Sequence, residues 1–254
     1  MTLTTESGVP GTRPEGVRDE REAAAHVREM FRRIAPRYDL LNHLLSLDVD
    51  KLWRRRVAKR FRATLQNPAA RVLDLCCGTG DLALAFRGEA PRGAEIVGSD
   101  FTTEMLARAR AKAAAAGLQV TFFEADALAL PFTDASFDLV SCSFGFRNLA
   151  NYERGLVEIF RVLKPGGAVA ILEFAEPPGK LFGTVYRFYF RRVLPLLGGM
   201  ISGNASAYMY LPSSVGKFPL PEALQAQFSQ VGFVQTRFER WTGGIVTLHT
   251  GVRP

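Results

Sequence analysis

Hydrophobic and polar positions follow two alternating patterns along the chain, one typical of strands and one typical of helices. Five short apolar runs predict β-strands: "RVLDLC" (71–76), "AEIVGSD" (94–100), "VTFFEAD" (120–126), "FDLVSCS" (137–143) and "GAVAILEF" (167–174). Helical spacing begins between these runs, near Asp81, Thr102 and Asn151. Short apolar strands that alternate with helices predict an α/β fold, with a mostly parallel sheet covered by helices on both faces.

The N-terminal region divides into a polar segment and a helical one. Residues 1 to 20 mix charged residues with Gly, Pro and Thr and hold no apolar run, so we expect a disordered tail rather than a signal peptide. Residues 21 to 62 show helical spacing, and Pro36 ends the first helix. The apolar positions of that helix are Val27, Met30, Phe31 and Ile34. We expect this region to form an N-terminal helical cap.

The C-terminal region departs from the alternation before returning to it. "RVLKPGG" (161–167) predicts the end of a helix and a turn into the fifth strand. Residues 178 to 218 are aromatic, aliphatic and basic, and we expect an insertion there that completes the cap. Three elements then follow: a helix over 221–231 and strands over 233–240 and 244–251. The sequence therefore predicts a single domain over residues 21 to 254.

Composition and charge bound the class of protein. The chain has 254 residues, 47% of them hydrophobic, which is enough for one large domain with a buried core. Lys and Arg exceed Asp and Glu by 32 to 25, giving a formal net charge of +7. This excess favours an acidic partner, such as nucleic acid or an anionic membrane surface, but it is equally compatible with an ordinary basic enzyme.

The three cysteines and the absence of long apolar runs bear on the compartment. Cys76, Cys77 and Cys142 are odd in number and two are adjacent, so they form neither a disulfide framework nor a zinc site. We therefore expect a reducing compartment and no metal. No uninterrupted apolar stretch reaches the roughly 20 residues that cross a bilayer. These features favour a cytoplasmic protein.

The stretch "LDLCCGTGDLAL" (73–84) predicts a buried strand, a glycine turn and a helix, an arrangement that holds nucleotide-like ligands. Gly78 and Gly80 fit the permissive glycine pattern of a dinucleotide site, and this match alone is weak. Asp74 lies near the end of the strand, where its carboxylate would repel a phosphate. A carboxylate suits a ligand that carries an ammonium and a sulfonium group, as S-adenosylmethionine does.

Four strand ends carry residues that suit a cofactor. Asp100, after the second strand, can accept hydrogen bonds from ribose hydroxyls, and Asp126 with the Ala127 backbone can contact the adenine edge. Thr79 and Ser143 lie at the ends of the first and fourth strands. Asp100 and Asp126 could instead be helix N-caps, Thr79 a turn former and Ser143 an incidental loop hydroxyl. Their occurrence at successive strand ends favours one shared crevice.

Five longer blocks resemble a known family: "YDLLNHLLSLDVDKLWRRRV" (38–57), "FGFRNLAN" (144–151), "RVLKPGGAVAILEFAEP" (161–177), "YLPSSVGKFP" (210–219) and "GGIVTLHTG" (243–251). With the glycine turn, they resemble the class I S-adenosylmethionine-dependent methyltransferases. More closely, they are similar to the ubiquinone/menaquinone biosynthesis C-methyltransferase family. The resemblance extends from about residue 26 to residue 252.

The resemblance implies a Rossmann-like, seven-stranded sheet with an antiparallel edge hairpin. It also implies C-methylation of a polyprenyl hydroquinone with S-adenosyl-L-methionine as cofactor. We expect the substrate to be demethylmenaquinol, in menaquinone biosynthesis, and the alternative is the benzoquinol step of ubiquinone biosynthesis. By the same resemblance Thr79, Asp100, Asp126, Ala127 and Ser143 would contact the cofactor, and Asp74, Gly78 and Gly80 form the turn that we expect to hold it.

Two positions depart from the family pattern. Cys76 and Cys77 stand in the glycine turn, where smaller residues are expected, and we interpret them as a variation in packing. Thr250 stands in "LHTG", where an arginine is common, and this departure weakens any role for the C-terminal strand.

The proposed chemistry needs a nucleophilic ring carbon held in line with the methyl group. A hydroquinone hydroxyl resembles that of tyrosine, with a pKa of about 10, and its phenolate would donate electron density to the adjacent ring carbon. Arg147, in "FGFRN", is the first candidate to stabilise that anion, and the alternative is a structural ion pair with an acid. Tyr38 and Asn42 would contact the ring. His43, His249 or a water molecule is the candidate base.

A polyprenyl tail also needs an apolar passage and access to a bilayer. Residues 180 to 218 hold five basic residues, no acid and many apolar ones, so we expect a transient association with an anionic membrane surface. The alternative is a cap that only packs on the sheet. An assembly of like chains, or with other quinone-biosynthesis enzymes, is a further expectation.

Other functions stay open on this evidence. "KLWRRRVAKRFR" (51–62) holds seven basic residues and no acid, which is the best argument for an RNA methyltransferase. We nevertheless expect no nucleic acid, because "CSFGFRN" (142–148) stands where an amine-methylating motif would follow the fourth strand. A methyltransferase for another small molecule, a nicotinamide-dependent oxidoreductase and a catalytically silent partner of quinone enzymes are the remaining alternatives.

Overall fold

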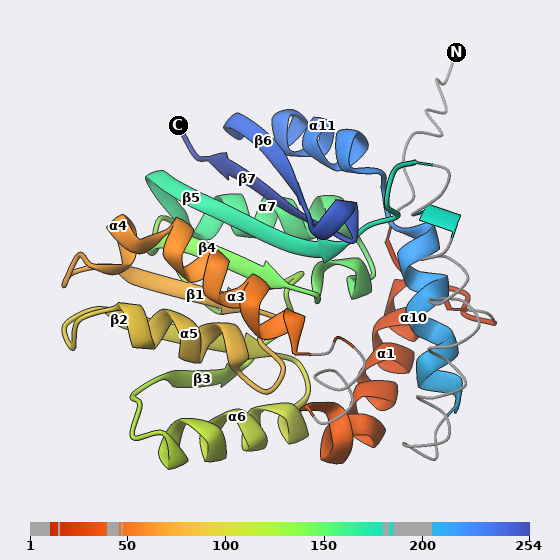
Figure 1. The fold of residues 1–254 in the computed structure, drawn as a ribbon, viewed down its shortest axis with the longest axis horizontal. Helices are drawn as coiled ribbons and strands as arrows, with labels where there is room; N and C mark the ends of the chain where they lie inside the picture. Colours follow the sequence, from red (N-terminus) through yellow and green to blue (C-terminus); the bar gives the residue numbers. More distant parts are fainter. Residues whose placement is uncertain (1–10, 15, 40–45, 47, 180–182, 185–204) are drawn as a thin grey trace.

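A seven-stranded sheet forms the centre of the protein (Figure 1). The computed structural model describes residues 11–14, 16–39, 46, 48–179, 183–184 and 205–254. The strand order is β3-β2-β1-β4-β5-β7-β6, with β7 antiparallel to both of its neighbours. The strands are β1 Arg71–Leu75, β2 Glu95–Asp100, β3 Thr121–Glu124, β4 Phe137–Ser143, β5 Leu163–Phe174, β6 Val234–Trp241 and β7 Val246–Val252. The predicted sheet with its antiparallel edge hairpin is confirmed.

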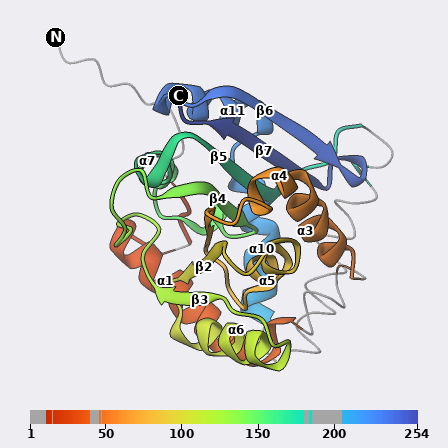
Figure 2. The same ribbon diagram turned by 90° about the vertical axis from the view of Figure 1, so that its left-hand side faces the viewer.

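Helices cover both faces of the sheet, because successive strand residues point to opposite faces. Val72 joins a buried cluster with α3, α5 and α6, whereas Leu73 joins another with α7 and α11. The five helices are α3 Val49–Arg60, α5 Asp81–Glu89, α6 Thr103–Ala115, α7 Tyr152–Val162 and α11 Pro221–Val231. Figure 2 shows α3 and α7 on opposite sides of the sheet. Each helix start predicted between the strands is confirmed to within one residue.

Two further helices lie beyond the carboxyl ends of the parallel strands, α1 (Glu20–Ile34) and α10 (Ala205–Lys217) (Figure 1). A short 3-10 turn, η1 (Ala35–Arg37), follows α1. In α3, by contrast, Trp53 and Val57 are buried in the cluster on one face of the sheet. The region expected to be one N-terminal cap is thus divided between the strand ends and a sheet face.

The cap insertion expected over residues 178 to 218 falls largely outside the described residues. Within it the structure describes residues 178, 179, 183, 184 and 205–218. Residues 205–217 form α10. A hydrogen bond between Tyr210 and Asn148 joins α10 to the short helix η2 (Phe146–Asn148), which follows β4.

The strand β5 begins earlier than the sequence indicated. The segment "KPGG" (164–167) predicts a turn, yet Leu163 already pairs with Phe137, and the strand includes the four residues that follow. The register then shifts so that Ala168 pairs with Leu139, which makes the segment a bulge. Gly166 has a φ of +77°, a conformation that favours glycine. The helix stop is confirmed, whereas the turn is a bulge within the strand.

The expected N-terminal tail does not extend to residue 20. Residues 1 to 10 and 15 lie outside the described residues, but residues 11 to 14 lie against the loop after β4. The Thr12 N–H donates to the Leu149 carbonyl at 2.7 Å, and Thr12 is buried. Low hydrophobicity predicted disorder here, but backbone hydrogen bonds and contacts with the loop hold this segment in place.

Candidate functional site

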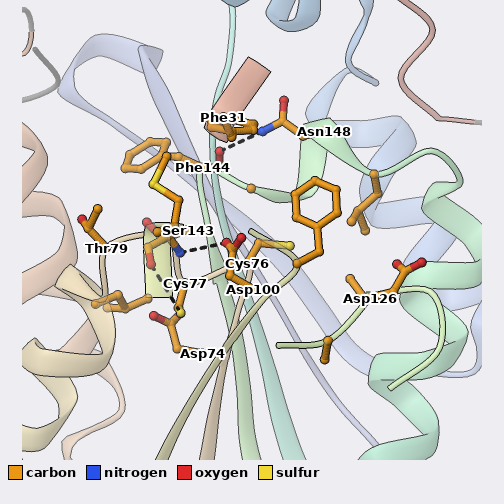
Figure 3. Close-up of a pocket in the computed structure, with 18 of the residues that line it drawn as sticks. Phe31, Asp74, Cys76, Cys77, Thr79, Asp100, Asp126, Ser143, Phe144 and Asn148 are labelled. Carbon is orange, nitrogen blue, oxygen red and sulfur yellow. Dashed lines mark hydrogen bonds between the residues drawn. The ribbon is translucent and has the colours of Figure 1, made fainter. Parts of the chain in front are cut away.

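A pocket opens beyond the carboxyl ends of β1, β2 and β4, the place where parallel sheets bind ligands (Figure 3). Its volume, including the open space at its mouth, is about 890 Å³. Its lining includes Ala24, Phe31, Tyr38, Arg54, Asp74, Cys76, Cys77, Gly78, Thr79, Asp81, Asp100, Asp126, Ala127, Ser143, Phe144 and Asn148. All the predicted cofactor residues except Gly80 therefore line one pocket.

The glycine turn between β1 and α5 has a left-handed backbone at two glycines. Gly78 has a φ of +55° and Gly80 a φ of +85°, conformations that other residues rarely adopt. Gly80 is the N-cap of α5, and a Cβ at this position would lie 3.1 Å from the Cβ of Ala109. Gly80 thus allows α5 to approach α6 closely and has no place in the pocket lining.

Asp74 is buried on β1, and both of its carboxylate oxygens accept hydrogen bonds within the protein. The Ser141 hydroxyl donates to Oδ1 and the Ala83 N–H donates to Oδ2, each at 3.0 Å. Burial raises the pKa of Asp74 to about 7, although these hydrogen bonds and the nearby Arg54 oppose the rise. Asp74 therefore holds the first turn of α5 in addition to placing acid in the pocket.

Asp100, the last residue of β2, connects two loops at the pocket. Its Oδ2 accepts from the Gly78 N–H at 3.0 Å, and its Oδ1 accepts from the Thr102 N–H at 2.8 Å. Burial raises the pKa of this carboxyl, and the two backbone donors oppose the rise. The carboxylate has lone pairs beyond the two in use, so it can also accept from a ligand.

Asp126, Ala127 and Ser143 complete the polar side of the pocket. The Asp126 carboxylate accepts from the Leu128 N–H at 2.9 Å, so it stabilises a turn instead of the helix N-cap that the sequence left open. Ala127 is buried beside it. The Ser143 hydroxyl is buried and has no hydrogen-bond partner among the described residues. A buried polar atom of this kind calls for a partner, and the pocket is where a ligand could supply one.

A charged network ties the glycine turn to the N-terminal region. The Lys112 ammonium donates to Asp39 at 3.1 Å, to the Thr79 hydroxyl at 3.2 Å, and to Asp81. The Thr79 hydroxyl itself donates to Asp39. These side chains come from α6, the turn, the start of α5 and the segment after η1. The network therefore holds the N-terminal region against the turn.

Arg54 is a site residue that sequence reasoning missed. It lies on α3, is buried, and is the cation in the described pocket lining. Asp50 accepts a hydrogen bond from it, Asp81 lies 3.9 Å away, and its guanidinium stacks 5.3 Å from the centre of the Phe144 ring. From the sequence alone, the basic run around Arg54 served only as an argument for RNA binding. The sequence signal that could have identified Arg54 as a buried residue is its position directly after Trp53, an apolar residue that is itself buried.

Aromatic side chains form the other side of the pocket. Phe31 on α1 packs edge-on against Tyr38, with ring centres 6.1 Å apart, and Phe144 follows β4. In Figure 3, Phe31, Phe144 and Asn148 lie together above the strand ends. Tyr38 also lines the pocket, and its contact with a substrate ring stays a prediction. Asn42 lies outside the described residues.

Arg147 adopts the alternative role that the sequence left open, that of a structural ion pair. Its Nη1 donates to Glu173 at 3.0 Å and to the Phe144 carbonyl, and its Nε donates to the Ser214 hydroxyl at 3.3 Å. Both charged side chains are buried, and Arg147 is absent from the pocket lining. A catalytic role for Arg147 stays a prediction, and this geometry favours support of the loop that carries Phe144.

His249, a candidate base, lies away from the pocket. It is on β7, where it packs beside Phe228 and Phe238, and its Nε2 lies 3.1 Å from the Pro221 carbonyl oxygen. Burial lowers its pKa to about 4. A buried, neutral histidine that does not line the pocket is a poor base for a ligand there. The other candidate, His43, lies outside the described residues.

The two departures from the family pattern have different surroundings. Cys76 and Cys77 line the pocket, and Cys76 packs tightly against Gly145, where an added Cβ would lie 2.4 Å from the Cβ of the cysteine. Thr250 is on β7 and accepts a hydrogen bond from Arg237 at 3.4 Å. The cysteines thus shape the wall, and Thr250 is absent from the lining.

This chain matches the model of a methyltransferase family, described as the ubiE/COQ5 methyltransferase family, over residues 17–253. The chain belongs to this family. A demethylmenaquinone methyltransferase from Thermus thermophilus is 57% identical over 89% of this chain and 100% of that protein. One of the same name from Deinococcus radiodurans is 51% identical over 92% of this chain and 95% of that protein. A ubiquinone/menaquinone biosynthesis C-methyltransferase from Geobacter sp. is 45% identical over 91% of this chain and 98% of that protein.

Solved structures of more distant methyltransferases share the fold. A SAM-dependent methyltransferase from Thermotoga maritima has a TM-score of 0.60 at 19% identity, covering 90% of this chain and 100% of that one. A phosphoethanolamine N-methyltransferase from Haemonchus contortus, in complex with S-adenosyl-L-methionine, has a TM-score of 0.54 at 18% identity, covering 73% of this chain and 49% of that one. These likenesses concern the fold alone, and they confirm the Rossmann-like class predicted from the sequence.

Proposed function

We propose that the protein transfers a methyl group from S-adenosyl-L-methionine to a ring carbon of demethylmenaquinol. The observation that carries this proposal is one pocket with two unlike sides, an acidic side at the strand ends and an aromatic side with Phe31, Tyr38 and Phe144. The acidic side suits a cationic cofactor, and the aromatic side suits a flat ring. Relatives at 57% and 51% identity that bear the name demethylmenaquinone methyltransferase support the choice of substrate.

The acidic side fits the cofactor. When bound, S-adenosyl-L-methionine supplies a methyl group activated by its sulfonium. Asp100 would accept hydrogen bonds from the ribose hydroxyls, and Asp126 with the Ala127 backbone would contact the adenine. The unpartnered hydroxyl of Ser143 supports a ligand on this side, because bound cofactor would give that buried atom a partner. Thr79 and Gly78, in the turn, would lie beside the amino-acid end.

The aromatic side would orient the quinol ring. Tyr38 would face the ring, and we propose that Asn42, which follows it in sequence, also contacts the ring. The ring must give up its phenolic proton, and a cation near the phenolate would favour that loss. Arg147 would act on the ring indirectly, because its guanidinium holds the Phe144 carbonyl. Arg54 is the guanidinium that lines the pocket itself.

The test is transfer of labelled methyl from S-adenosyl-L-methionine to reduced demethylmenaquinone in detergent, with the product mass recorded. A benzoquinol precursor of ubiquinone is assayed in parallel, because relatives at 45% identity carry both pathways in their name. We expect label on demethylmenaquinol. Label on the benzoquinol alone would move the protein to ubiquinone biosynthesis. Label on neither, with cofactor binding confirmed by calorimetry, would reject a quinone substrate and direct the search to RNA or other small molecules.

We further propose a transient association with an anionic membrane surface, where the prenyl tail of the substrate resides. None of the helices in the described part of the chain is long and apolar enough to span a bilayer. The helix α3 exposes Arg55, Arg56 and Lys59 beside Leu52, whose side chain is 63% exposed, and such a face suits anionic headgroups. Vesicles with anionic lipid should co-sediment with the protein at low salt, and neutral vesicles should not.

Assembly is also part of the proposal, because a membrane-bound substrate would pass between quinone-biosynthesis enzymes at the cytoplasmic face. Light scattering of the purified protein would report an assembly of like chains. Co-purification with other quinone-biosynthesis enzymes in detergent would report an association with them. A monomer in light scattering, together with no co-purifying enzyme, would reject this part of the proposal.

A further inference from the structure

Residues 11 to 14, which we call the N-terminal strap, lie against a loop that forms part of the pocket wall. The Thr12 N–H donates to the Leu149 carbonyl at 2.7 Å, and the Arg13 guanidinium donates to the Ala150 carbonyl at 2.8 Å. The approach is close at Gly11, where a Cβ would lie 2.1 Å from the Ala150 oxygen. Leu149 and Ala150 both line the pocket. The strap therefore holds the outside of the wall whose inside faces the ligand.

A hydrogen-bond chain runs from the strap into the pocket. The Thr12 hydroxyl lies 3.0 Å from the Tyr210 hydroxyl, and the Tyr210 hydroxyl donates to Asn148 Oδ1 at 3.0 Å. Because Tyr210 gives its one proton to Asn148, Thr12 has to be the donor to Tyr210. With its oxygen engaged by Tyr210, Asn148 donates one Nδ2 hydrogen to the Phe144 carbonyl at 3.5 Å (Figure 3). The second Nδ2 hydrogen is available to a ligand in the pocket that Asn148 lines.

The strap is joined to α10 as well as to the wall. The Lys217 ammonium donates to the Arg13 carbonyl at 3.3 Å, and Thr12 is only 6% exposed between Tyr210 and the loop. The match to the family model begins at residue 17, after the strap. The strap therefore lies outside the residues that the family model matches.

We propose that the N-terminal strap belongs to the quinol-binding side of the pocket, and that Thr12 is a positioning residue that sets the Asn148 amide through Tyr210. The inference rests on the proposed function, because the aromatic side is where the quinol would lie. A fixed amide places a hydrogen-bond donor toward a ring oxygen, whereas a flipped amide would present an acceptor there instead. None of the expected cofactor residues makes any of these contacts.

The test compares Thr12→Val, which keeps the shape and removes the hydroxyl, with Tyr210→Phe and with the double variant. Loss of one neutral hydrogen bond corresponds to roughly threefold to tenfold, so we expect kcat/KM for demethylmenaquinol to fall by about that factor in Thr12→Val. The double variant should be no worse than Tyr210→Phe, because the two hydroxyls act in one chain. Affinity for S-adenosyl-L-methionine should stay within about twofold of wild type in all three.

Two controls separate positioning from folding. Thr12→Ser restores the hydroxyl and should restore kcat/KM, and Thr121→Val, at an exposed threonine of β3, should match wild type. Removal of residues 1 to 14 should lower kcat/KM for the quinol by more than Thr12→Val does, with cofactor affinity preserved. Wild-type kcat/KM in both the truncated chain and Thr12→Val would overturn the inference. Additive losses in the double variant, or equal loss of cofactor affinity, would also overturn it.

The proposed function is tested by the wild-type protein in the same assay. If wild type transfers no methyl group to demethylmenaquinol, the proposed function fails and this inference fails with it. If wild type is active and the strap variants equal it, the strap inference alone fails.

Discussion

The carboxylate of Asp100 accepts hydrogen bonds from the backbone and, in the proposed function, would also accept hydrogen bonds from the cofactor. Asp100→Ala removes the acceptor for Gly78 and Thr102 and the expected contact with ribose. We expect affinity for S-adenosyl-L-methionine to fall by about 1.5–3 kcal/mol, roughly 10- to 100-fold, because the lost hydrogen bonds are charge-assisted. Calorimetric titration measures this change. Glu95→Ala, at the exposed start of the same strand, is the control, and unchanged affinity in Asp100→Ala would place the cofactor elsewhere.

The buried pair of Arg147 and Glu173 allows a structural role to be separated from a catalytic one. Arg147→Ala leaves the Glu173 carboxylate without its charged partner, so we expect a loss of about 3–5 kcal/mol in the free energy of unfolding. Replacing both residues, as Arg147→Met with Glu173→Leu, removes both charges and should recover most of this stability. Urea denaturation measures the difference.

Turnover in the same variants decides the role of Arg147. If the double variant recovers stability and methyl transfer together, Arg147 acts by supporting the loop after β4. If stability returns while transfer stays lost and cofactor affinity is normal, the guanidinium has a role at the ring, as the sequence predicted. The present geometry leads us to expect the first result.

At the scale of single elements, the start of α7 provides a direct test of helix capping. The Asn151 side chain accepts from the Arg154 N–H at 3.0 Å and donates to Glu20 on α1 at 2.9 Å. Asn151→Ala should lower the free energy of unfolding by about 1 kcal/mol, since it removes the cap. Asn151→Ser keeps a capping oxygen, so it should lose less in thermal or urea denaturation. Equal losses would assign the effect to the contact with Glu20.

Elements were predictable where their signals are local. The starts of α5, α7 and α11 follow from Asp81, Asn151 and Pro221, because capping and proline preferences act within one turn of helix. The strand-end residues of the cofactor side followed from the geometry of parallel sheets. The bulge in β5 and the strap did not, because each depends on pairing with residues distant in sequence. The burial of Arg54 and the identity of Glu173 as the partner of Arg147 could not be predicted either, because both depend on contacts between segments distant in sequence.

At the scale of the whole molecule, His249 links stability to pH. Its pKa is about 4 in the folded protein, against 6.5 for the unperturbed side chain. Above pH 6.5 both the folded and the unfolded states are neutral at this residue. Between pH 6.5 and 4 the unfolded chain takes up a proton that the folded protein does not, so stability is lost as the pH falls, by about 3 kcal/mol in total.

The measurement is the free energy of unfolding from urea denaturation at pH 7.5, 6 and 5. His249→Gln removes the titrating ring, so its stability should decline less steeply than that of wild type over this range. Parallel curves for the two proteins would mean that the imidazole is protonated equally in the folded and unfolded states.

The acidic side of the pocket has a consequence for the end of the catalytic cycle. Four aspartates and one arginine are the charged residues in the described lining: Asp74, Asp81, Asp100, Asp126 and Arg54. The methyl donor enters with a positive sulfonium, and the thioether left after transfer is neutral. The same field that attracts the donor therefore holds the spent molecule less tightly. By charge alone, the pocket would therefore release the spent molecule more readily than it releases the donor.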